Sequence, residues 1–287
     1  MSSSRDIRRR IRSVGGTAQI TKAMQMVAAS KMRKAQDAAL AGRPFVRLIY
    51  RFQREATTAT REFNHPLTEV REIQRRAVIL VAADKGLCGA LNSNLFRLAA
   101  QFDPASTVFI TAGRKAAQFV AATRRQLVAE FAYGDSPTFP ESRAIAACAR
   151  DLFLKKEVDE VRVLATRFVN TLTQQPVSLE FLPVGEIKGL EIPGIEREID
   201  LSASEETLFE PSSKAFLGYL LSHYLNIYIY QVLLNAKASE QSARMVSMKN
   251  ATDNANDLID DLSLAYNKLR QANITKELLE IAGGQAG

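Results

Sequence analysis

Few residues in this chain of 287 have the types and the spacing that enzyme chemistry needs. Its two histidines, His65 and His223, and its two cysteines, Cys88 and Cys148, lie far apart in the sequence. They form no cluster with the spacing of zinc ligands, and two cysteines cannot build a disulfide scaffold. We therefore expect no metal site, and the low cysteine content favours a reducing compartment.

The turn from Asp84 to Ala90, DKGLCGA, is the segment most suggestive of chemistry, because it follows an apolar run. It contains neither G-x-G-x-x-G nor GxxxxGK[ST], so we expect no phosphate-binding loop and no cofactor. Cys88 has no histidine within 77–185 to activate it, which favours a buried thiol over a nucleophile. Asp84 and Lys85 could belong to an active site at a strand's carboxyl end, but a helix-capping or interface pair is favoured. No catalytic residue is predicted.

The elements that hold this turn alternate between strands and helices. Apolar runs predict strands over 77–83, 107–112, 127–132, 160–168 and 177–182, and helical patterns lie around 92–101, 114–122 and 142–156. Strand–helix alternation with continuous apolar strands predicts a Rossmann-like, mostly parallel α/β sheet. Residues 185–211 hold five of the chain's prolines and glycines and have no periodicity, so a connecting loop is expected over 186–211.

The last part of the chain predicts one very long helix. Residues 219–282 include no glycine or proline, and at about 1.5 Å per residue they would extend ~96 Å. Their mostly apolar seam repeats at alternating spacings of four and three, the period of a coiled coil. The seam consists of Leu220, Tyr224, Ile227, Gln231, Leu234, Ala238, Gln241, Met245, Met248, Thr252, Ala255, Ile259, Leu262, Tyr266 and Leu269.

The N-terminal part, about 4–60, has the same period and is the obvious partner for that helix. Only Thr21 and Gln25 interrupt its apolar seam, and Gly42-Arg43-Pro44 predicts a bend near residue 44. Because a lone long helix cannot bury its seam, we expect an antiparallel coiled coil of the N- and C-terminal helices, with the α/β domain inserted between them. The N-terminal seam consists of Ile7, Ile11, Val14, Ala18, Ala28, Met32, Ala35 and Ala39.

A stretch without charged residues, 215–236, has the length of a membrane span. It includes Ser222, His223, Asn226 and Gln231, and an unpaired polar group in hydrocarbon costs roughly 2–7 kcal/mol. We therefore favour a helix buried against protein over a transmembrane helix.

Positive charge is concentrated at the N-terminus. Residues 1–54 contain thirteen Lys/Arg against Asp6 and Asp37, a net charge of +11, whereas the whole chain has +7. Such an arm favours a polyanionic partner, and a basic coiled-coil protein that binds nucleic acid is one alternative. It predicts strongly salt-sensitive binding, but the basic arm has no aromatic residue before Phe45. A second alternative is an α/β enzyme, which predicts that a ligand stabilises residues 77–185 alone.

Three segments resemble the gamma subunit of the F-type rotary ATP synthase. They are ITKAMQMVAASKMRKAQ (20–36), DKGLCGALN (84–92) and SEQSARMVSMKNATDNANDLIDDLSLAYNKLRQANITKELLEI (239–281). The terminal segments are long and specific, and all three follow the family's order, so the resemblance covers the full length. Small departures are Gly15-Gly16, where the family has a polar pair, and Lys85, where it often has arginine.

The resemblance implies a central-stalk rotor subunit that couples proton flow through the membrane c-ring to ATP synthesis or hydrolysis, and that takes part in regulating both. The implied subunit is not an enzyme on its own. Its implied partners are the alpha and beta subunits of the catalytic head, the epsilon subunit and the c-ring, with no nucleic acid. It would be a peripheral protein on the cytoplasmic face of the bacterial inner membrane.

The resemblance also implies the residues that contact the alpha/beta head. It places Met24 beside the moving loops of the beta subunits, and Arg270, Gln271, Thr275 and Glu277 at the contact that holds the shaft in the head. Because Met24 lies one position off the seam, its side chain should point partly outward. The expected domains are an N-terminal coiled-coil helix over 1–60, the α/β domain over 77–185, the loop over 186–211 and a C-terminal coiled-coil helix over 212–287.

Overall fold

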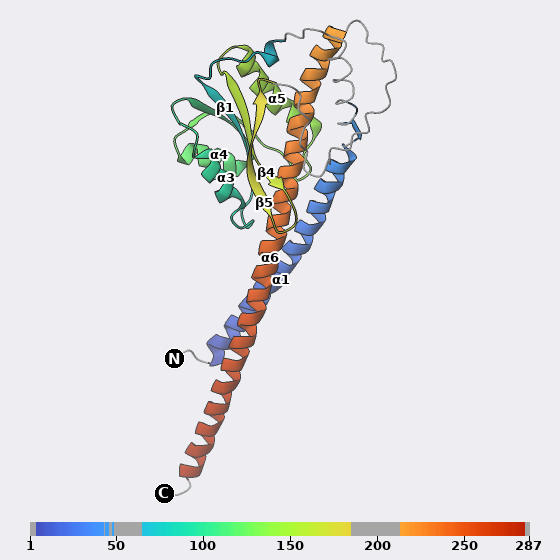
Figure 1. The fold of residues 1–287 in the computed structure, drawn as a ribbon. Coiled ribbons are helices and arrows are strands. Elements are labelled where there is room, and N and C mark those ends of the chain that lie inside the picture. The colour runs from blue at the N-terminus through green and yellow to red at the C-terminus, as the bar shows by residue number, and fades with distance from the viewer. Residues whose placement is uncertain (1–3, 43, 46–47, 49–64, 185–212, 285–287) are drawn as a thin grey trace. The chain divides into compact units, whose positions relative to one another are not determined.

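The computed structural model describes residues 4–42, 44–45, 48, 65–184 and 213–284, without the side chains of 213–215, 276–277 and 280–284 (Figure 1). The expected loop over 186–211, and the expected N-terminal helix from residue 49 to 60, lie outside these residues. The chain divides into two compact units. The first unit consists of Met1–Ala28 and Arg244–Gly287, and the second of Ala29–Ala243. Helices α1 (Ser4–Ala41) and α6 (Ser213–Gly284) contribute residues to both units.

A five-stranded sheet in the order β3-β2-β1-β4-β5 forms the centre of the second unit. Its strands are β1 (Arg76–Val81), β2 (Thr107–Ala112), β3 (Gln126–Phe131), β4 (Glu160–Phe168) and β5 (Gln174–Leu182). The pairs β3–β2, β2–β1 and β1–β4 are parallel, whereas β5 runs antiparallel to β4. The mostly parallel α/β sheet predicted from the sequence is therefore confirmed.

Helices cover both faces of the sheet (Figure 1). Strand residues such as Val78 and Leu80 pack on one face with α3 (Leu91–Ala99) and α4 (Arg114–Ala122). Their neighbours Ile79 and Val81 point to the other face, where α5 (Phe139–Leu154) and the first half of α6 pack. This alternation explains why β1 is apolar at every position from Ala77 to Val81: both sides of a central parallel strand are buried. A short 3₁₀ helix, η1 (Pro66–Thr68), precedes the sheet.

The stretch without charges, 215–236, lies in α6 and belongs to the core of the α/β unit. Leu221, Leu225, Ile229 and Leu233 pack into the same apolar cluster as β1 and α5. A helix buried against protein was the favoured interpretation, and the structure confirms it. In the part of the chain that the structure describes, no helix has the length and apolarity that crossing a bilayer requires.

The terminal helices pair in the first unit. Thr21 of α1 contacts Thr252 of α6, and Arg8 contacts Tyr266. Because Arg8 precedes Thr21 whereas Tyr266 follows Thr252, the helices run antiparallel, as predicted. All fifteen seam positions of α6 are buried or half-buried; those before Arg244 lie in the second unit, where Tyr224 and Ile227 belong to the core of the sheet. Thr21 is buried and Gln25 half-buried, so the two polar residues that interrupt the apolar pattern of α1 keep their places in the seam.

Candidate partner interface

The residues expected to contact a partner lie on the two terminal helices, and they differ in burial. Met24 is half-buried on α1, as its place one position off the seam predicts. Arg270, Gln271 and Thr275 are exposed on α6. Glu277 lies in α6, but its side chain is outside the described residues.

The hydroxyl of Thr275 donates a hydrogen bond to the backbone carbonyl of Gln271, one turn earlier, at 3.0 Å. Its proton is thus used within the helix, and its oxygen lone pairs remain able to accept from another molecule. The amide of Gln271 and the guanidinium of Arg270 provide further donors on this exposed segment. The segment can therefore make directional polar contacts without a buried charge of its own.

The end of α6 has little of the described part of α1 opposite it. Only Ser4–Ile7 of the described α1 precede Arg8, which contacts Tyr266, so the last turns of α6 extend past the described start of α1. Three apolar side chains there are exposed, Ile274, Leu278 and Leu279. The sequence pattern did not predict them, because the seam identified from it ends at Leu269. Exposed apolar residues beside polar ones are typical of a surface that another protein covers.

Some of the basic side chains of α1 have partners within their own unit. Arg8 donates a 2.6 Å hydrogen bond to the hydroxyl of Tyr266, and its guanidinium lies 5.4 Å from the centre of that ring. Arg9 pairs with Asp6. Four exposed aspartates also lie on the paired part of α6, at 253, 257, 260 and 261. This mixture of signs differs from the uniformly basic face that a nucleic-acid-binding helix presents.

The turn after β1 has a structural role. Oδ1 of Asp84 accepts a 2.9 Å hydrogen bond from the backbone N–H of Arg114, the first residue of α4. Cys88 is buried, and its sulfur accepts a 3.5 Å hydrogen bond from the side-chain amide of Asn92. Of the helix-capping or interface pair favoured for Asp84 and Lys85, the contact with α4 bears out the capping alternative for Asp84, and the buried thiol favoured for Cys88 is confirmed.

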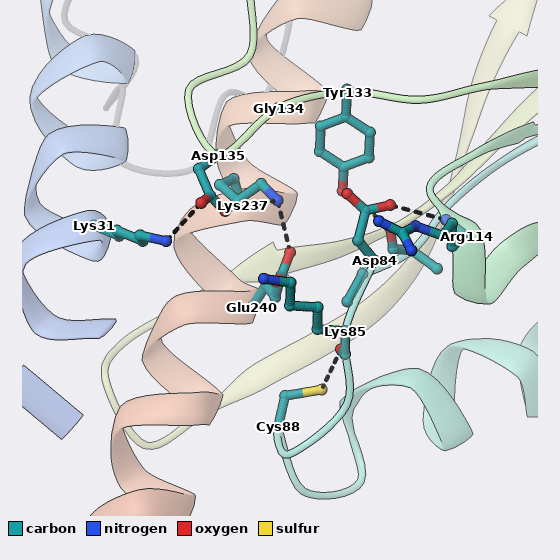
Figure 2. A network of polar contacts seen from close by, with 12 residues as sticks. Lys31, Asp84, Lys85, Cys88, Arg114, Tyr133, Gly134, Asp135, Lys237 and Glu240 are labelled. Carbon is teal, nitrogen blue, oxygen red and sulfur yellow. Dashed lines mark hydrogen bonds and ion pairs between the residues drawn. The ribbon is translucent and has the colours of Figure 1, made fainter. Parts of the chain in front are cut away.

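A second group of polar side chains gathers near this turn, and no spacing in the sequence predicts it. We call it the Asp135 cluster: Lys31 of α1, Tyr133 and Asp135 of the loop between β3 and α5, and Lys237 and Glu240 of α6 (Figure 2). Lys31 Nζ lies 2.5 Å from Oδ2 of Asp135. Lys237 Nζ lies 3.9 Å from Oδ1 of the same carboxylate and 3.0 Å from Oε2 of Glu240.

Burial and charge set the protonation of two members of the cluster. The hydrogen bond from Lys31, and the positive charges of Lys31, Lys237 and Lys85, lower the pKa of Asp135 below its usual value. Burial raises the pKa of Tyr133 well above its usual value, and the negative charges of Glu240 and Asp84 raise it further. At neutral pH the Tyr133 hydroxyl is therefore protonated, and it donates to the carbonyl of Ala82 at 3.0 Å.

Comparison with known proteins gives matches over the full chain. A family model described as ATP synthase matches residues 3–287. The ATP synthase gamma chain of Opitutus terrae is 45% identical over 291 residues, which cover 99% of this chain and 98% of that protein. The ATP synthase gamma chain of Methylacidiphilum infernorum is 41% identical, with 99% of each chain covered.

Solved structures show the same fold at lower identity. The central stalk and c-ring structure of the Tetrahymena thermophila mitochondrial ATP synthase includes a chain with a TM-score of 0.60 and 24% identity, matched over 81% of this chain and 99% of that one. A rotor structure of the Euglena gracilis mitochondrial ATP synthase gives a TM-score of 0.65 at 19% identity, over 94% and 98% of the two chains.

Proposed function

The chain belongs to the gamma-chain family of ATP synthase, and on that basis we propose that it is the central rotor subunit of an F-type enzyme. In this role it couples proton flow through a membrane c-ring to ATP synthesis or hydrolysis in an alpha/beta head. The observation that carries the proposal is the 45% identity to a gamma chain across 99% of this sequence.

The terminal helices have the mechanical properties that a rotating shaft needs. α6 is a single helix of 72 residues, and α1 adds 38 residues that pair with it in the antiparallel direction. Two helices packed along a seam resist bending better than one helix does. Because the helices differ in length, the shaft is asymmetric, and an asymmetric shaft can impose different conformations on identical catalytic sites around it.

We assign the contacts with the head to Met24, Arg270, Gln271, Thr275 and Glu277. Met24 offers a flexible, uncharged side chain, half-buried beside the seam, which can slide past the loops of the beta subunits. The exposed tip of α6 offers polar groups beside Ile274, Leu278 and Leu279, a mixture that suits a bearing surface inside the head. The epsilon subunit and the c-ring are then the partners of the α/β domain.

The proposal also assigns the chain's location and its lack of catalytic activity. It is a non-catalytic subunit, held peripherally through its complex at the cytoplasmic face of a bacterial inner membrane. We propose that the chain consists of coiled-coil helices over 1–60 and 212–287, the α/β domain over 77–185 and a connecting loop over 186–211.

Substitutions at the proposed contacts test the assignment in assembled complexes. Thr275→Ala and Gln271→Ala each remove hydrogen bonds worth about 0.5–1.5 kcal/mol, so we expect slower ATP turnover with normal assembly. Met24→Lys adds a cation that pairs with acidic loops, and a partly desolvated pair is stronger than the ~0–1 kcal/mol of an exposed one. We expect this variant to hydrolyse ATP but to pump fewer protons per ATP in membrane vesicles.

Thr123→Ala is the matched control for Thr275→Ala. Thr123 is also exposed at the end of a helix, and its hydroxyl donates to the carbonyl of Phe119 four residues earlier, but it lies in the α/β domain. Loss of turnover in Thr275→Ala but not in Thr123→Ala supports a contact with the head. Wild-type turnover and wild-type pumping in Met24→Lys, Gln271→Ala and Thr275→Ala would contradict the assigned contacts.

A further inference from the structure

We propose that the Asp135 cluster fixes the axial and rotational setting of both terminal helices against the α/β domain, so that torque passes between domain and helices without slippage. This inference rests on the proposed rotor function, and it adds positioning residues that the proposed head contacts do not include.

Asp135 connects two helices at once. One carboxylate oxygen pairs with Lys31 of α1 and the other faces Lys237 of α6, while Asp135 itself belongs to the loop between β3 and α5 (Figure 2). All three residues lie in the same compact unit. A single side chain of the domain thereby holds a point on each helix.

The contact with α6 is buried and continues into the sheet. The residue Lys237 is 1% exposed, and its ammonium group lies 4.6 Å from the centre of the Tyr133 ring. The Tyr133 hydroxyl donates to the carbonyl of Ala82, which directly follows β1. Contacts therefore run from the central strand through Tyr133 and Lys237 to α6, and through Asp135 to α1.

Burying a lysine is costly, and an apolar side chain of similar size would pack here at a lower cost. The ammonium group of Lys237 faces two carboxylates and an aromatic ring. Its attraction to these three groups weakens when α6 turns or shifts by a residue, so the contact favours one orientation of the helix. Polar residues at otherwise apolar helix positions are known to specify register at the expense of stability.

The neighbouring contacts of α6 point to the same role. Toward its start, α6 packs on the sheet through apolar side chains such as Leu225 and Leu233, which tolerate small displacements. After Lys237 the contacts become directional: the Ser239 hydroxyl donates to the carbonyl of Thr166 at 3.2 Å, and the Ser242 hydroxyl donates to that of Thr171 at 2.9 Å. The Asp135 cluster thus begins the segment of α6 whose register is fixed by hydrogen bonds.

The test compares Asp135→Asn with the double variant Lys237→Met/Glu240→Gln in the assembled complex. Asparagine keeps the shape of the carboxylate but removes its charge, and the double variant replaces a buried ion pair by neutral side chains of similar volume, which preserves folding. Losing a charge-assisted contact should raise the population of displaced helix settings about tenfold. We expect near-normal ATP hydrolysis, with proton pumping per ATP reduced by about half or more under an opposing proton gradient.

A conservative rescue and a control separate positioning from general stability. Asp135→Glu should restore coupling, whereas Asp151→Asn, an exposed carboxylate on α5, should leave it unchanged. Cysteines at Thr166 and Ser239, in a chain with Cys88→Ser and Cys148→Ser, report the register directly: their disulfide yield should fall when Asp135→Asn is added.

Each outcome bears on one hypothesis. If the complex with the wild-type subunit hydrolyses ATP without pumping protons, the proposed function fails whatever the variants do. If the wild-type complex pumps, and Asp135→Asn and the double variant pump equally well with an unchanged disulfide yield, the positioning role is wrong. If coupling falls in both variants and returns in Asp135→Glu, the positioning role is supported.

Discussion

A pair of buried threonines in the coiled-coil seam gives the sharpest prediction about stability. The hydroxyls of Thr21 and Thr252 lie 2.7 Å apart, and each is also within reach of a carbonyl of its own helix: Thr21 reaches Ala18 at 3.0 Å and Thr252 reaches Met248 at 2.8 Å. Two hydroxyls have two protons, so only two of these three hydrogen bonds can form at any moment. The perturbation is to replace either or both threonines by valine, which has the same shape.

The expected magnitudes follow from this count and from the one hydroxyl that each single variant leaves buried against a valine methyl group, which adds a cost that the double variant does not have. Thr252→Val removes one hydroxyl and leaves Thr21 able to donate to Ala18, so one hydrogen bond is lost, at a cost of about 0.5–1.5 kcal/mol. Thr21→Val has the same consequence for the other helix. In the double variant no buried hydroxyl is left and two methyl groups enter an apolar seam, which is close to neutral. We therefore expect the double variant to lose less than the sum of the singles, by roughly 0.5–1 kcal/mol.

Urea unfolding of the purified chain, followed by far-ultraviolet circular dichroism, measures these differences. Thr17→Val is the matched control, because Thr17 is exposed on the same helix and its hydroxyl donates to the carbonyl of Ser13. Its effect should stay within about 0.5 kcal/mol. Strictly additive losses in the double variant, or single losses no larger than that of the control, would refute the assignment of a coupled pair.

Four further predictions concern the α/β domain and helix α1. Gly113→Ala should lower the free energy of unfolding by about 2–4 kcal/mol in thermal melts, because φ is +96° there and an added Cβ would lie 2.1 Å from the carbonyl oxygen of Ala82. Gly15→Ala, with nothing within 4 Å of its added Cβ in a helix interior, should instead stabilise by about 0.5–1 kcal/mol. The pKa of Asp135 is lowered in the folded state. Its contribution to the free energy of unfolding is therefore fully present above the unfolded-state pKa near 3.8, and it is lost as the pH falls through the folded-state pKa. In urea unfolding at decreasing pH, the difference in stability between wild type and Asp135→Asn should vanish in acid. Titration calorimetry with ATP should detect no tight site on the isolated chain, because the turn after β1 has no phosphate-binding loop; one tight site would contradict that reading.

The elements of this fold were largely predictable because their signals are local. The four-three spacing from Leu220 to Leu269 identifies a buried helix face without knowledge of its partner, and every seam position is at least half-buried. The apolar runs at 77–83 and 107–112 predict strands buried on both faces, and they became β1 and β2. Full-length resemblance to a family then suggested a function that periodicity alone could not.

The contacts that position these elements came only from the tertiary structure. Lys31, Asp135 and Lys237 are separated by about a hundred residues from one to the next, and no spacing rule predicts that one carboxylate meets both lysines. The sequence showed Thr21 as a break in the seam, whereas the structure shows a hydrogen-bonded partner, Thr252, on the other helix. Helix and strand periodicity are set by neighbouring residues. Which charge faces which carboxylate is set by the order of strands and the direction of helices, and these exist only once the chain has folded.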